Sequence, residues 1–225
     1  MNTAKHHQLK RIIGIILFCT LILSIIYALT MYLLSPSQSA ATDLYKKVKT
    51  DYLLMLTQCV LGLIVMMLPA MLERKWKLPV PNAIVILYYC FLYCAIYLGE
   101  VKNFYYLIPH WDDILHGFSG AMLGALGFIL VDILNKDPKV KVQLSPIFVS
   151  LFAFCFALAV GALWEVYEFA FDALLGLNMQ KHTTEAGVAL VGIDALSDTM
   201  IDIIVDACSS LIVSILGFFA IRKKS

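Results

Sequence analysis

The chain has 225 residues, of which 61% are hydrophobic and 15% charged, and its mean hydropathy is +0.84. Soluble domains contain about 45–50% apolar and roughly 25% charged residues, so this composition argues against a soluble globular domain. Disordered chains combine low hydrophobicity with high net charge, and neither is present here. The formal net charge of +1 gives no general attraction for nucleic acid, which is not expected as a partner.

Six apolar stretches are long enough to cross a bilayer as helices, because a helix needs about 20 residues to cross ~30 Å of hydrocarbon. In chain order they are 12–34, 52–72, 82–98, 112–134, 146–171 and 194–221. The third, with 17 residues, is at the short limit. The first, with 23 residues, exceeds the apolar region of a signal peptide, so we expect it to stay as a span.

Basic connections between long apolar runs do not match the alternating pattern of a membrane β-barrel. We therefore predict an all-α, polytopic transmembrane helix bundle that forms a single membrane domain over residues 1–225. Basic residues also set the expected orientation, since they accumulate on the cytoplasmic side. With a cytoplasmic N-terminus, 12 of the 17 Lys and Arg residues fall inside, and the five outside are Lys46, Lys47, Lys49, Lys102 and Lys181.

The fourth stretch begins with acids placed on the same helix face as a histidine. Asp112 and His116 are four residues apart, and Asp113 and His116 are three apart. The same face continues through glycines, which allow close approach of another helix, so we expect it to pack against protein and not lipid. These glycines are Gly117, Gly120, Gly124 and Gly127.

Two further acidic stripes lie at the end of the fifth stretch and the start of the sixth. The fifth stretch carries Ala157, Gly161, Glu165, Glu168 and Asp172 at steps of three or four. The sixth carries Asp194, Asp198, Asp202 and Asp206 at steps of four. In the expected topology all three acidic groups lie at similar depth in the outer leaflet.

Acids at that depth need compensating charge. A charged side chain in mid-bilayer costs about 2.5–3.5 kcal/mol on insertion scales, and so many carboxylates cannot all stay ionised without bound metal or protons. Histidine with Asp and Glu suits Mn, Zn or Fe. The candidate ligands of a divalent metal are Asp113, His116, Glu165, Glu168, Asp198 and Asp202.

Three short motifs carry a family resemblance: His116-Gly-Phe-Ser-Gly120, Trp164-Glu165-x-x-Glu168 and Asp198-Thr-Met-x-Asp202. In order and spacing they resemble the YjdF-like bacterial inner-membrane proteins, over roughly residues 100–215. The resemblance implies a six-helix type of protein in the bacterial plasma membrane. The function of that family is not established, so the resemblance implies no substrate.

Three hypotheses of function follow from the acidic site. The leading one is a divalent-metal-dependent hydrolase that acts on a lipid or envelope substrate. The alternative is a cation- or proton-coupled transporter, although the first three stretches carry no charge at mid-depth and no paired broken helices mark inverted repeats. The third is a membrane scaffold or sensor in which the acids only hold helices together.

The 12-to-5 distribution of basic residues predicts that both termini are cytoplasmic. Reporter fusions at each terminus and in each connection measure this directly. A C-terminus outside the cytoplasm, after Arg222 and Lys223, would contradict it and remove the common depth of the acidic groups.

Overall fold

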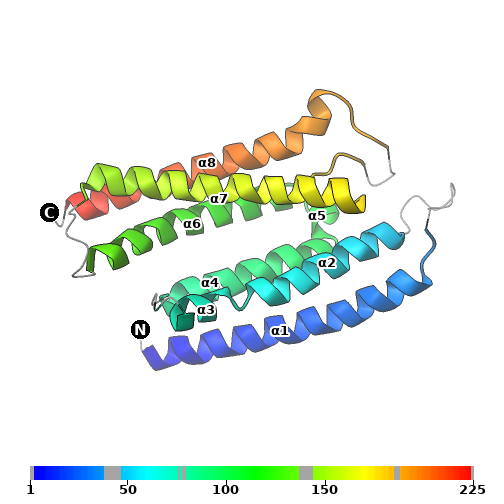
Figure 1. Ribbon diagram of the computed structural model, residues 1–225, viewed down its shortest axis with the longest axis horizontal. Coiled ribbons are helices and arrows are strands. Elements are labelled where there is room, and N and C mark those ends of the chain that lie inside the picture. Colours follow the sequence, from blue (N-terminus) through cyan, green and yellow to red (C-terminus); the bar gives the residue numbers. More distant parts are fainter. Residues whose placement is uncertain are drawn as a thin grey trace. The chain divides into compact units, whose positions relative to one another are not determined.

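The computed structural model describes residues 3–37, 47–75, 77, 80–136, 144–184 and 188–223 (Figure 1). Helices account for most of these residues, and the described part contains one antiparallel bridge, between Thr183 and Ala189. The chain folds into two compact units. The first unit comprises Met1–Trp111 with Glu168–Asp198, and the second comprises Asp112–Tyr167 with Thr199–Ser225.

Six helices are long and apolar enough to cross a membrane, one for each predicted stretch. They confirm the all-α helical fold, and their ends lie a few residues beyond most of the predicted ones. The six are Lys5–Leu34, Lys49–Lys75, Asn82–Val101, Trp111–Asn135, Pro146–Leu175 and Ile193–Arg222.

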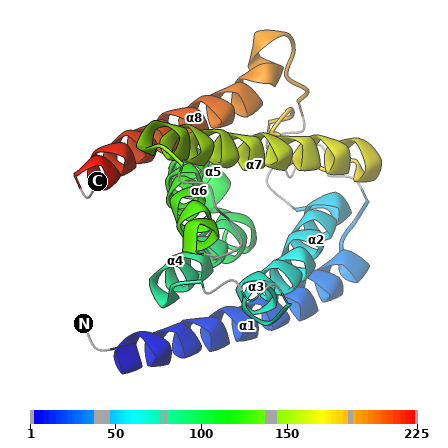
Figure 2. The same ribbon diagram turned by 60° about the vertical axis from the view of Figure 1, so that its left-hand side comes forward.

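The first unit is built on a pair of long helices that lie side by side (Figure 1, Figure 2). Leu17 and Leu21 of the first helix pack with Met55, Cys59 and Ile96 in one buried apolar cluster. The elements of this unit are α1 (Thr3–Leu34), α2 (Lys49–Val65), α3 (Leu68–Lys75), α4 (Asn82–Leu92), the π-helix η1 (Tyr93–Val101) and α5 (Phe104–Leu107).

The second predicted span is interrupted between α2 and α3. Pro69 has no N–H and cannot donate to the carbonyl of Val65, four residues earlier. The Tyr88 hydroxyl of α4 donates to that Val65 oxygen at 2.9 Å. The broken helix therefore keeps this carbonyl hydrogen-bonded within the apolar unit.

The third predicted span continues past residue 98 as the π-helix, which brings it to 20 residues. The N–H of Lys102 donates to the Tyr97 carbonyl at 2.9 Å, five residues back, and Asn103 then ends the helix with a left-handed φ of 65°. The ring of Tyr105 lies directly against Gly99, where a larger residue would displace it. The end of this span thus depends on side-chain packing, which the spacing of apolar residues in the sequence does not indicate.

The second unit consists of three long helices that contact one another. They are α6 (Trp111–Lys136), α7 (Pro146–Leu175) and α8 (Ile193–Arg222). Trp111, the last turns of α7 and the first turns of α8 belong to the first unit.

The predicted glycine face of α6 packs against these neighbours. A Cβ added at Gly120 would lie 3.1 Å from the Asp206 Cα of α8, and one added at Gly127 would lie 2.7 Å from the Ala153 Cα of α7. Gly124 is looser, with the Val213 Cβ at 3.4 Å. The prediction that this face meets other helices is confirmed.

These distances predict opposite outcomes for two glycine substitutions on α6. Gly127→Ala forces the α6 and α7 backbones apart and should destabilise the bundle by about 1–3 kcal/mol. Gly117→Ala meets only the Val205 Cγ1, at 3.5 Å, and should be neutral or gain up to ~1 kcal/mol of helix propensity. Thermal unfolding in detergent measures both, and equal melting temperatures for the two variants would contradict the close α6–α7 approach.

Candidate metal centre

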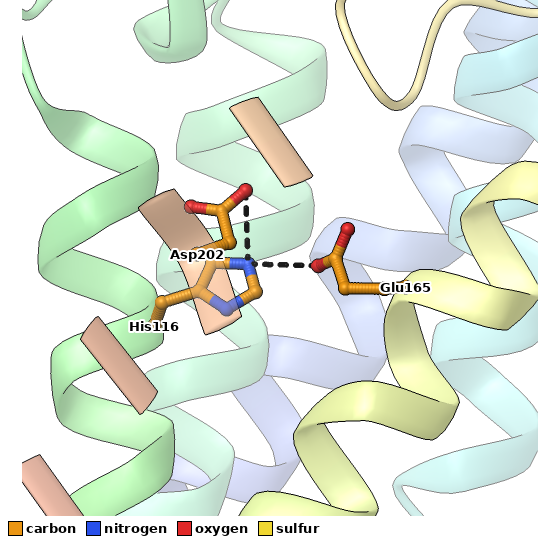
Figure 3. A group of neighbouring side chains, drawn as sticks. All are labelled: His116, Glu165 and Asp202. Atoms are coloured by element: carbon orange, nitrogen blue, oxygen red, sulfur yellow. Dashed lines mark ion pairs between the residues drawn. The ribbon is translucent and has the colours of Figure 1, made fainter. Parts of the chain in front are cut away.

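His116 occupies the second turn of α6, and its side chain is nearly buried. Figure 3 shows its ring between carboxyl groups of the two other helices of the second unit. The Nε2 atom is 3.8 Å from Glu165 Oε1 of α7 and 3.8 Å from Asp202 Oδ2 of α8. One ligand atom from each of the three residues lies within 4.8 Å of the others, so one ion is within reach of all three.

Two more carboxyl groups border the same ring. Asp112 Oδ1, one turn before His116 on α6, is 3.9 Å from Nε2. Asp206 Oδ2, one turn after Asp202 on α8, is 3.3 Å from Nδ1. An ionised Asp206 only accepts hydrogen bonds, so with it this contact places a hydrogen on Nδ1, and Nε2 is the ring atom that faces Glu165 and Asp202.

Small residues make this arrangement possible. A Cβ added at Gly161 of α7 would overlap Asp206 Oδ2, so glycine there provides the space that the carboxyl group occupies. Gly120 of α6 likewise admits the α8 backbone at Asp206. The glycines therefore determine where the acid can sit as well as how closely the helices pack.

The ionisable groups around His116 are mostly acidic. In the sequence, every Lys and Arg of this unit falls within residues 136–141 or 222–224. Four carboxyl groups surround the imidazole, which carries at most one positive charge. Buried charge is costly unless it is paired, so a bound cation would stabilise ionised carboxylates at this position.

The carboxyl groups around the ring differ in their exposure to solvent. The Asp112 side chain is 22% exposed, whereas those of Asp202 and Asp206 are 2% exposed. The cluster is thus accessible near the start of α6 and closed toward Asp206.

The structure brings together three of the six predicted ligands, His116, Glu165 and Asp202. Asp113 is half-buried on α6, while the carboxyl group placed beside the ring is that of its neighbour Asp112. Glu168 and Asp198 fall in the first unit, where Asp198 Oδ1 lies 3.4 Å from Lys181 Nζ. Asp113 and Glu168 stay candidate ligands by their spacing in the sequence.

Asp206 was absent from the predicted ligand set, although the four-residue spacing of the acids on α8 already included it. It lies deeper in the span than the other acids of this helix. Its carboxyl group fits at that depth because Gly161, on another helix, leaves space for it.

Asp172, the last acid of the predicted α7 stripe, has a different role in the first unit. Its two oxygens accept hydrogen bonds from the backbone N–H groups of Met179 and Gln180, at 2.8 and 3.0 Å. It therefore organises the connection between α7 and α8.

A family of predicted membrane proteins and an uncharacterised bacterial protein are similar to this chain. Residues 11–223 match a family model described as "Predicted membrane protein (DUF2238)", a range that includes every residue of the cluster. An uncharacterised protein of Thermotoga maritima is 32% identical over 109 residues, which are 48% of this chain and 48% of that protein. The match thus spans about half the length of this curated relative. No solved structure matches the chain.

Proposed function

The chain belongs to the DUF2238 family of predicted membrane proteins, and we propose that it is a bacterial plasma-membrane hydrolase with a divalent metal at His116, Glu165 and Asp202. One observation carries the proposal: Nδ1 of His116 lies 3.3 Å from Asp206 Oδ2, while Nε2 faces carboxyl groups of two other helices. A histidine held by a carboxylate on one nitrogen and ligating through the other is a recurrent arrangement in metal sites. The bacterial relative supports the assignment to a bacterial membrane.

The distances fit an ion of this kind. Two ligands ~2.1 Å from a zinc ion at the tetrahedral angle are about 3.4 Å apart. The two contacts of Nε2 at 3.8 Å need only small side-chain adjustments to reach that spacing. One nitrogen and two carboxylate oxygens suit Zn, Mn or Fe, and the positive charge offsets the surplus of buried carboxylates.

The exposure gradient suggests how the site would act. A divalent metal held by His116, Glu165 and Asp202 would supply the Lewis acidity that activates water to attack an ester or phosphoester. Asp112, the most exposed of the four carboxyl groups, lies beside His116 without being needed as a ligand. It is positioned to act as the general base for water that enters from its side.

Metal binding predicts a shift in thermal stability. Free metal at 100 times its dissociation constant stabilises the native state by ~2.7 kcal/mol, which corresponds to a rise of about 5–10 °C in melting temperature for a chain of this size. The measurement compares wild type with chelator and with added Mn, Zn or Fe. Elemental analysis of the purified protein identifies the metal retained.

Two variants serve as test and control. Asp202→Asn should abolish the metal-dependent rise, and its metal-free form should be as stable as wild type or more so, because repulsion between carboxylates is relieved. Asp194→Asn, an exposed acid on the same helix, should keep the rise. If wild type shows no rise with any of the metals, the metal site is rejected. Loss of stability in Asp202→Asn with and without metal would favour the scaffold hypothesis.

Hydrolysis is tested separately from binding. We expect the metal-loaded protein in detergent to hydrolyse bis(p-nitrophenyl) phosphate or a p-nitrophenyl fatty-acid ester. Asp112→Asn should keep the metal-dependent rise in melting temperature but lower the rate by about 10²–10⁴-fold, the usual contribution of a general base. Binding without turnover of either probe would reject the hydrolase and retain the metal site.

A further inference from the structure

One end of the first unit carries a surplus of basic residues. In the sequence, residues 1–42 and 66–82 contain six Lys and Arg residues and a single acid, Glu73. Five of the six basic side chains are exposed, and Lys10 is half-buried. We call these six residues the basic end; they are Lys5, Lys10 and Arg11 of α1, Arg74 and Lys75 of α3, and Lys77.

The two segments of the basic end approach the same part of α4. A Cβ added at Gly14 of α1 would lie 3.0 Å from Tyr89 Cε2 of α4. Glu73 of α3 interacts electrostatically with the same tyrosine. Arg11 precedes Gly14 by one turn, and the basic residues of α3 directly follow Glu73. In Figure 1, α3 lies toward the end of the unit that is marked N, so both segments present their cations at that end.

Exposed apolar side chains lie next to these cations. Leu9 and Ile12 flank the basic pair of α1 and are exposed. Met71 of α3 is also exposed and lies one turn before Arg74 and Lys75. Lipid covers the exposed apolar side chains of a spanning helix, whereas the long basic side chains beside them extend toward the headgroups. The basic end is therefore expected at the depth of the lipid phosphates.

The lysines at the opposite end of the first unit already have partners. Lys47 Nζ donates to a backbone carbonyl at 3.4 Å, and Lys181 Nζ is 3.4 Å from Asp198 Oδ1. The Nζ atoms of Lys49 and Lys102 lie 5.9 and 5.6 Å from the centres of tyrosine rings. By contrast, no side chain of the basic end forms an ion pair within the residues that the structure describes. Its cations are thus available to a ligand from outside the chain.

From this contrast we propose that the basic end binds the phosphodiester headgroup of an anionic phospholipid, held by Arg11 of α1 and by Arg74 and Lys75 of α3. Guanidinium groups bind phosphate oxygens bidentately, and clusters of four to eight Lys and Arg next to a membrane helix recognise anionic lipids. A lipid fits better than a soluble anion, because its acyl chains would cover the neighbouring Leu9 and Met71.

The bound lipid would connect two segments that the chain itself links weakly. The break at Pro69 separates α3 from α2, so the backbone hydrogen bonds of α2 do not fix the position of α3. A phosphate that bridges α1 and α3 would stabilise this part of the first unit. The lipid site needs neither metal nor hydrolysis, because the proposed metal ligands belong to the second unit.

The experiment measures the melting temperature of the full chain in an uncharged detergent that contains chelator, with and without added lipid. Saturating phosphatidylglycerol should raise the melting temperature of wild type by about 5 °C, since a ligand of the native state stabilises it by mass action. Phosphatidylcholine, whose headgroup carries its own cation, and inorganic phosphate should give no rise. High salt should remove most of the rise, because it screens exposed charges.

Neutral variants test the residues. The triple variant Arg11→Gln, Arg74→Gln, Lys75→Gln should require at least about tenfold more phosphatidylglycerol for the same rise. Arg11→Lys with Arg74→Lys retains the charge and should keep most of the rise. If the triple variant does not fold, Arg74→Gln with Lys75→Gln replaces it, because both side chains are exposed.

The matched control removes the same charge from the opposite end of the unit. Lys47→Gln, Lys49→Gln, Lys102→Gln should keep the response to phosphatidylglycerol, because these lysines are already engaged within the chain. Equal rises with phosphatidylglycerol and phosphatidylcholine, a rise with inorganic phosphate as large as that with lipid, a rise that persists in high salt, or an unchanged response in the arginine and lysine triple variant would each overturn the lipid site. None of these results alters the metal-dependent shift, which tests the proposed function separately.

Discussion

The contact between His116 Nδ1 and Asp206 is the constraint on which the rest of the second unit depends. It requires a carboxyl group deep in α8 to reach an imidazole on α6, and this is possible only because Gly161 and Gly120 leave room at that level. Once the ring is fixed in this way, Nε2 faces Glu165 and Asp202. Helix packing and the positions of these four side chains are therefore set by the same small residues.

Two acids of the first unit show how a carboxylate charge is ordinarily compensated in this chain. Asp51 accepts the backbone N–H of Val48 at 2.7 Å at the start of α2, and Asp198 lies beside Lys181. Each of these groups has a donor or cation of conventional kind near the end of a helix. The four carboxyl groups of the second unit surround a single imidazole inside the bundle, an arrangement that is costly for a scaffold and useful for binding a cation.

Helical periodicity was sufficient to predict the six spans, the packed glycine face of α6 and the grouping of His116, Glu165 and Asp202. These features repeat every three or four residues, so each can be predicted from the sequence of a single helix. The break at Pro69 has an equally local cause, although the predicted span ran through it. Asp206 and the π-helix were missed because each depends on a residue distant in sequence or outside the span: Gly161 for the first and Tyr105 for the second.

The register of α8 also explains why the cluster opens to one side. Steps of four residues place Asp202 and Asp206 against the imidazole on the buried face of the helix. Asp112, the most exposed of the four carboxyl groups, borders the ring from α6. Water and substrate would therefore approach the proposed metal from the Asp112 side, and a general base that activates the attacking water has to lie on that same side.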